Sequence, residues 1–194
     1  MRHAKTLIIL VAFLVQGSFV LSQEQVEEDS NGRLSSRFDL SYMFGGQFYN
    51  DHFVYDPGVS VQFTQSYRVT ESFEAGLGTG YISLMNENFI PIYLEAFAYK
   101  KNKSNTPVIR FQAGAVVAWF NTANYPTDYS MNGILFFSAG MGRKISLKNR
   151  YSILFQWSIT HITARISYPI FGSQDYASLA NYDMLQLSFG ILRN

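Results

Sequence analysis

The sequence predicts an all-β fold, closed as an eight-stranded antiparallel up-and-down transmembrane β-barrel. Three observations predict it. Eight segments alternate apolar and polar residues, an apolar N-terminal segment has the make-up of an export signal, and no later stretch reaches the ~20 apolar residues of a spanning helix. Successive side chains of a strand point to opposite faces, so each segment presents one apolar and one polar wall. An even number of strands places both ends of the barrel chain on the periplasmic side.

The chain is expected to have three parts. Residues 1–22 form a signal peptide, because Arg2 and Lys5 precede an apolar core at 7–15 and a cleavage site fits at the end of the segment. Residues 23–35 are polar and acidic without any period, which indicates a flexible periplasmic lead-in, with a partner-binding peptide as the alternative. The outer-membrane barrel is then expected over residues 36–194.

The first alternating segment shows the pattern clearly, with Phe38, Leu40 and Tyr42 on one parity and Arg37 and Asp39 on the other. The eight segments are 37–48, 53–69, 73–82, 90–100, 108–120, 133–145, 151–163 and 182–192. Periplasmic turns are expected at 69–72, 101–107 and 146–149, and outside loops at 49–52, 83–89, 121–132 and 164–181.

Aromatic residues are expected to form two belts, one near each end of the apolar wall. A transmembrane barrel places such belts at the two membrane interfaces, and a soluble barrel has no reason to do so. The periplasmic belt would contain Phe38, Tyr67, Phe73 and Tyr151, and the outer belt Phe48, Phe53, Tyr81 and Trp119.

Composition excludes several classes of function. Cysteine is absent, so the chain has no disulfides and is not a lipoprotein acylated on cysteine. Acidic and basic residues nearly balance, which argues against nucleic-acid binding. Of the three histidines, His3 belongs to the signal and His52 to the first outside loop, so we expect no metal site and no cofactor. The basic periplasmic turns are explained by solvation, with contact to anionic lipid head groups as the alternative.

Charged residues on the inward parity of the expected strands include six candidates for an interior network. The interior of an eight-stranded barrel is just wide enough for side chains to fill it, and charges held there must pair. We therefore expect a network that plugs the lumen, with an ion-conducting path as the alternative. The six residues are Arg37, Asp39, Arg68, Glu74, Glu95 and Arg110.

Over roughly residues 36–194, the alternation, the aromatic belts, the strand number and the signal segment together resemble the small eight-stranded outer-membrane barrels of the OmpA and OmpX type. The resemblance is architectural. It implies a location in a bacterial outer membrane, reached through a cleaved signal peptide, with outer-membrane lipid as the surrounding partner.

The fragment His161-Ile162-Thr163 resembles the His-x-Ser element of the outer-membrane lipid A deacylases, which are also eight-stranded barrels. In that family a histidine, a serine and an acid on the outer surface of the barrel cleave an acyl chain from lipid A. Carried over by position, the resemblance implies His161 as base, Thr163 as nucleophile and Asp175 as orienting acid. The alternative is an interfacial histidine beside Trp157 at the polar–apolar boundary of the wall.

The preferred interpretation is a non-enzymatic barrel with a plugged polar interior, which acts as a structural or surface-interaction protein through its outside loops. The longest connection, 164–181, carries exposed apolar bulk, so Tyr168, Ile170 and Phe171 are the candidates for contact with a protein or surface ligand. The enzymatic alternative is a lipid A deacylase-like hydrolase that uses His161, Thr163 and Asp175. A soluble ligand-binding barrel is a third reading, and it would need the opposite placement of apolar residues.

Overall fold

The structure is a computed structural model that describes residues 33–49, 52–85, 87–100, 105–120, 130–147, 150–170 and 174–193. Within these ranges, nine strands form one antiparallel sheet. The strands are β1 (Leu34–Tyr49), β2 (His52–Tyr55), β3 (Gly58–Thr70), β4 (Phe73–Leu84), β5 (Glu87–Tyr99), β6 (Asn105–Phe120), β7 (Ser130–Ser146), β8 (Tyr151–Ile170) and β9 (Gln174–Arg193).

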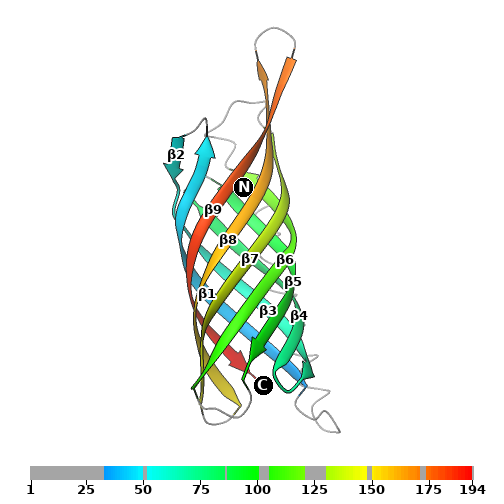
Figure 1. Cartoon of the computed structure of the whole chain (residues 1–194). Coiled ribbons are helices and arrows are strands. Elements are labelled where there is room, and N and C mark those ends of the chain that lie inside the picture. The colour runs from blue at the N-terminus through cyan, green and yellow to red at the C-terminus, as the bar shows by residue number, and fades with distance from the viewer. Residues whose placement is uncertain are drawn as a thin grey trace, which may run out of the picture. The chain divides into compact units, whose positions relative to one another are not determined.

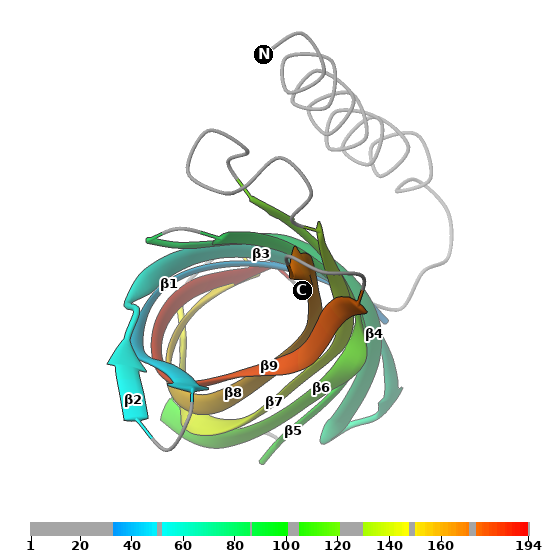
Figure 2. The ribbon, with the colours of Figure 1, turned by 90° about the horizontal axis from the view of Figure 1, so that it is seen from above.

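All of these strands except β2 close into a barrel. From β3 to β9 each strand pairs with the next in sequence, and β1 pairs with both β3 and β9, which closes the ring. Figure 1 shows the tilted strands from the side, and Figure 2 shows the closed ring from above. The predicted eight-stranded antiparallel barrel is confirmed.

The short strand β2 continues β3 beyond an interruption. Both strands pair with β1 in one continuous register, and Asp56 and Pro57 lie between them. Pro57 has no backbone N–H to donate to the ladder, so the strand expected at 53–69 is interrupted there. β1 and β2 pair as far as Tyr49 opposite His52, the two ends of the connection expected at 49–52.

Both ends of the barrel chain lie at one end of the barrel. β1 begins there at Leu34 and β9 ends there at Arg193, and we call it the terminal end; the opposite end is the distal end. The barrel therefore begins before residue 36, the start expected from the sequence, because Leu34 and Ser35 already pair with β3. The expected signal peptide and most of the expected lead-in lie outside the described residues.

The outer face of the wall is apolar. On β8, Phe155, Trp157 and Ile159 are 52%, 54% and 65% exposed, whereas Gln156 and Ser158 between them are buried in the lumen. Exposed apolar side chains also lie on the outer face of the other barrel strands. Such a surface would be untenable in water, but it suits the hydrocarbon of a membrane. Among the residues that the structure describes, no helix has the length and apolar character needed to span a membrane.

The aromatic residues expected in two belts are mostly on the outer face. Phe38, Tyr67 and Tyr151 are exposed towards the terminal end, and Phe53 and Tyr81 are exposed towards the distal end. Phe73 is half-buried. The side chains of Phe48 and Trp119 lie outside the part of the chain that the structure describes.

The lumen contains a polar belt, which extends from its middle to its terminal end, and two apolar clusters. The larger cluster fills the distal half and includes Phe89, Phe136 and Ile162, and a smaller one with Phe97 and Leu154 lies beside the polar belt. The expectation of a polar interior therefore holds for the middle and the terminal part of the barrel, but not for its distal half. The distal half is an apolar core, because inward positions there are occupied by large apolar side chains.

The connection expected as a long loop at 164–181 is mostly β-structure. β8 and β9 stay paired from Ala164 opposite Ala180 up to Ile170 opposite Gln174. The prediction of a long outside loop is therefore wrong, since the backbone of this segment forms the upper part of a hairpin. In Figure 1 this hairpin rises beyond the other strands.

Candidate functional site

Four of the six inward charges form one buried cluster in the polar belt. Arg37 Nε donates to Asp39 Oδ2 at 3.0 Å, and Arg110 Nη1 donates to the same oxygen at 2.9 Å. Arg37 Nη2 also donates to Glu95 Oε2. Two guanidinium groups therefore face two carboxylates, and this balance is what makes such a cluster tolerable away from water.

The remaining two charges pair nearer the terminal end. Arg68 Nε lies 3.7 Å from Glu74 Oε1, and Glu74 is fully buried. The Glu74 carboxylate also accepts from Tyr99 OH at 2.7 Å and from Ser35 Oγ at 2.6 Å. Because the large apolar cluster closes the distal half of the lumen, this arrangement is suited to holding strands together rather than to passing ions.

A second polar cluster lies on the outer face, where β8 and β9 approach the distal end. His161 lies opposite Asp183 in the strand register, and His161 Nδ1 donates to Asp183 Oδ1 at 2.8 Å. On the other side of the imidazole, His161 Nε2 lies 3.0 Å from Thr163 Oγ1. Thr163 Oγ1 in turn lies 3.1 Å from Asn181 Oδ1. These four residues, which we call the outer polar cluster, form one continuous hydrogen-bonded chain.

The acid expected from the sequence is not part of the outer polar cluster. Asp175 lies opposite Pro169, whereas Asp183 lies opposite His161. At about 3.3 Å per residue, the strand between the two acids spans about 26 Å, far beyond hydrogen-bond reach. Asp175 is therefore wrong as the partner of His161, and Asp183 occupies that position.

The hydrogen bonds of the outer polar cluster constrain its protons. A carboxylate only accepts, so His161 Nδ1 carries a hydrogen directed at Asp183. In the neutral imidazole, Nε2 is then an acceptor, and the Thr163 hydroxyl is placed to donate to it. A rotated Asn181 amide would supply the donor that Thr163 Oγ1 then accepts. This is the proton arrangement of a histidine that acts as a base towards a hydroxyl nucleophile.

The outer polar cluster is accessible and lies among apolar side chains. The side chains of His161 and Asp183 are 34% and 46% exposed. Leu135, Ile159 and Leu185 on the same outer face are also exposed. A molecule that approaches the cluster along the wall therefore meets apolar contacts first.

A β-bulge lies beside Thr163. Gly133 pairs with Ala164 and Leu135 pairs with Thr163, so Ile134 is an extra residue on β7 without a partner position on β8. Bulges disrupt the ladder locally and re-aim nearby groups, and they are frequent next to active sites. β1 also approaches the cluster closely at Gly45, which has φ 154°, and a Cβ there would overlap the carbonyl oxygen of Asp183.

The comparisons place the fold. No protein-family model matches the chain, and no curated protein matches it. The crystal structure of Neisserial surface protein A is similar with a TM-score of 0.62 at 10% identity, covering 86% of this chain and 99% of that one. The chain folds as a small outer-membrane β-barrel.

Two further solved structures are similar at lower scores. The outer membrane protein OprG from Pseudomonas aeruginosa has a TM-score of 0.48 at 11% identity, over 84% of this chain and 95% of that one. A de novo designed transmembrane β-barrel has a TM-score of 0.45 at 16% identity, over 86% and 98% of the two chains.

Other residues singled out in the sequence are not gathered into a site by the described structure. Tyr168 and Ile170 belong to β8 by their backbone, but their side chains, like the whole of Phe171, lie outside the described residues. His52 begins β2 and is exposed. Among the described residues, no group of three or more potential ligands could hold a metal ion.

Asp183 and Asn181 are the residues that sequence reasoning missed. The register of β8 and β9 places Asp183 opposite His161 and Asn181 opposite Thr163. The strands expected at 151–163 and 182–192 were not aligned residue by residue, so these two pairs were not predicted.

Proposed function

We propose that this outer-membrane barrel is a hydrolase that cleaves an ester-linked acyl chain from a lipid of the leaflet at its distal end. Lipid A is the expected substrate, on the resemblance to the outer-membrane lipid A deacylases. The observation that carries the proposal is the continuous hydrogen-bonded chain from Asp183 through His161 to Thr163. Thr163 would be the nucleophile, His161 the base and Asp183 the orienting acid.

The proposed reaction follows from the arrangement of these atoms. Thr163 Oγ1 attacks the ester carbonyl carbon while His161 Nε2 takes the hydroxyl proton. The bond to the alcohol oxygen then breaks, and the imidazolium returns its proton to that oxygen. A water molecule, deprotonated by the same nitrogen, attacks the acyl-threonine, releases the fatty acid and restores Thr163.

The surroundings support a lipid rather than a soluble ester. The outer polar cluster lies on the wall itself, with exposed Leu135, Ile159 and Leu185 next to it. An acyl chain that lies along this wall would bring its ester to the level of Thr163. Asn181 Oδ1 lies 3.1 Å from Thr163 Oγ1, and rotation of this amide would turn its NH2 group towards the reaction site, where it would donate to the developing oxyanion.

The test is mass spectrometry of lipid A from cells with and without the protein. We expect the loss of one acyl chain with the wild-type chain, and unchanged lipid A with His161→Ala or with Thr163→Val, which keeps the shape but removes the hydroxyl. Each variant must first be recovered from the outer-membrane fraction. Unmodified lipid A with a correctly inserted wild-type protein would reject the hydrolase.

A second candidate is the non-enzymatic surface role, and the observation that favours it is the long β8–β9 hairpin. Its ladder continues to Ile170 opposite Gln174, so it presents a rigid projection at the distal end. In this role the hairpin would contact a protein or surface ligand outside the cell. Binding to a surface ligand that survives His161→Ala but not removal of the hairpin tip would support this role.

Both roles require the same placement in the envelope. We infer that the terminal end faces the periplasm, and that the chain reaches the outer membrane after cleavage of residues 1–22. Sequencing of the N-terminus of the protein from the outer-membrane fraction would test the cleavage. Protease digestion of intact cells should cut only at the distal end.

A further inference from the structure

An apolar groove crosses the outer face of the barrel on the side away from β5. Its volume is about 780 Å³, and its side chains come from β3, β1, β9, β8 and β7. On either side of it the strand register aligns a row of side chains. Tyr42, Leu187 and Trp157 lie opposite one another in one row, and Leu40, Phe189 and Phe155 in the other.

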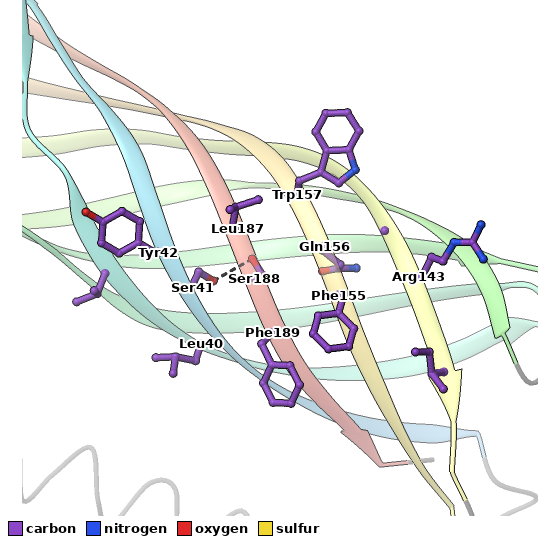
Figure 3. Close-up of a pocket in the computed structure, with 13 residues that line it drawn as sticks. Leu40, Ser41, Tyr42, Arg143, Phe155, Gln156, Trp157, Leu187, Ser188 and Phe189 are labelled. Atoms are coloured by element: carbon purple, nitrogen blue, oxygen red, sulfur yellow. Dashed lines mark hydrogen bonds between the residues drawn. The ribbon is translucent and has the colours of Figure 1, made fainter.

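Figure 3 shows these two rows and the line between them. Ser41 and Ser188 lie between the rows, but their side chains are bonded to each other inside the wall at 2.9 Å. The floor of the groove is therefore backbone, and its sides are apolar side chains that are about half exposed. The groove is a slot rather than a broad patch.

The slot has the direction and length of a lipid tail. It runs across the strands from Val59, near the distal end of β3, to Arg143, near the terminal end of β7. Four strand spacings of about 4.8 Å give it a length of about 19 Å, comparable to a long acyl chain. Strands of such barrels tilt by about 35–45°, so a line across them runs obliquely from one membrane interface towards the other.

Arg143 places a positive charge at the terminal end of the slot. It lies opposite Phe155 at the terminal end of the second row, and its side chain is exposed. Its Nη1 donates to the amide oxygen of Asn105 at 3.3 Å, and among the described residues no carboxylate pairs with it. A cation on a lipid-facing wall at the interface suits a phosphate group.

We propose that this groove is a binding site for one anionic glycerophospholipid of the leaflet at the terminal end. The acyl chain lies between the two rows, and the head-group phosphate binds Arg143. The site is separate from the outer polar cluster, which lies further along β8 and β9 towards the distal end. Its test therefore does not depend on the proposed hydrolase.

The test is native mass spectrometry of the folded full-length protein released from nanodiscs that contain equal amounts of phosphatidylglycerol and phosphatidylcholine. We expect the wild-type barrel to retain phosphatidylglycerol in preference. Arg143→Gln should reduce that preference about fivefold, the factor for one interfacial cation worth about 1 kcal/mol, and Arg143→Lys should keep it. Arg165→Gln, which removes an exposed arginine near the distal end, is the matched control and should have no effect.

The groove itself is tested by filling it. Leu187→Trp should lower retention of both lipids, whereas Leu94→Trp, at an exposed position of the wall outside the groove, should not. Heat-dependent gel migration verifies that each variant is folded before the measurement. Equal retention of the two lipids by the wild type, or an unchanged preference in Arg143→Gln, would show only bulk lipid around the barrel and overturn the proposal.

Discussion

Asp183 and Asp175 both lie on β9, which pairs with β8. Asp183 lies opposite His161 and is hydrogen-bonded to it, whereas Asp175 lies opposite Pro169. The two acids therefore form a matched pair for testing the catalytic role at the scale of single residues. Asp183→Asn removes the acceptor that fixes the imidazole with its Nε2 free to take a proton. We expect it to reduce the rate of acyl release by about 10³–10⁴-fold, the size of the effect in serine triads.

Asp175→Asn should leave that rate unchanged, because Asp175 lies opposite Pro169 near the hairpin turn. The rates would be measured as free fatty acid released from purified lipid A in detergent, with equal amounts of folded protein. If the two substitutions had equal effects, Asp183 would not be the orienting acid.

Asp39 accepts from two buried guanidinium groups, so its loss would leave both Arg37 and Arg110 with one ion-pair partner fewer. We expect Asp39→Ala to lower the free energy of unfolding by about 3–5 kcal/mol, the usual cost of breaking a buried pair from one side. Urea titration of the barrel in lipid vesicles, followed by tryptophan fluorescence, would measure it.

The control for Asp39 is Asp183→Ala, which removes a carboxylate that is 46% exposed. An exposed pair contributes roughly 0–1 kcal/mol, so this substitution should change the free energy of unfolding only slightly. Similar losses in the two variants would mean that the interior cluster contributes no more than a surface pair.

The resemblance to the lipid A deacylases identified His161 and Thr163 as a base and a hydroxyl that could act together, and the alternation of the strands identified the six inward charges. They could not identify Asp183 or Asn181. A cross-strand contact depends on the register of the hairpin, and register depends on where the turn lies. With 164–181 treated as an open loop, no residue-by-residue register was assigned between the strand at 151–163 and the strand at 182–192.

The upper part of the β8–β9 hairpin, residues 166–178, lies beyond Thr163 and Asn181, which form the pair of the outer polar cluster nearest the hairpin tip. At the scale of elements, we expect that replacing 166–178 with a two-residue Asn-Gly turn leaves the barrel folded. Arg165 and Leu179 would then flank the turn, and such turns suit the twist of antiparallel strands.

Two measurements follow for the shortened hairpin. Heat-dependent gel migration should match the wild type, and acyl release should be retained because His161 and Asp183 remain paired below the new turn. Loss of folding would mean that the extension is needed for barrel closure, and loss of acyl release alone would mean that the tip takes part in substrate binding.

Alternation predicted the strands well where one face is clearly apolar, as for Phe155, Trp157 and Ile159 on β8. It did not predict the apolar distal core. Phe136 lies in the run Leu135-Phe136-Phe137, where both parities are apolar, so the sequence does not say which side chain faces the lumen. The bulge at Ile134 also changes the parity within β7, and a bulge cannot be read from alternation.

At the scale of the whole molecule, the lumen has an apolar core in its distal half and a polar belt from its middle to its terminal end. A permeating ion would have to leave water and cross the apolar core. Phe89, Phe136 and Ile162 in the distal core are fully buried and offer no polar atom to replace the hydration shell. Burial of an unpaired ion in such surroundings is very costly.

We therefore expect no stepwise ion conductance when the folded barrel is inserted into planar lipid bilayers. Insertion would be verified by recovery of folded protein from the same membranes, with a general porin as the positive control. The charges of the polar belt do not alter this expectation, because Arg37 and Arg110 are already paired with Asp39 and Glu95 and the apolar core still lies between them and the distal end. Discrete conductance steps that disappear when Arg110 or Glu95 is substituted would instead assign the belt to an ion path, and the distal core would then have to open.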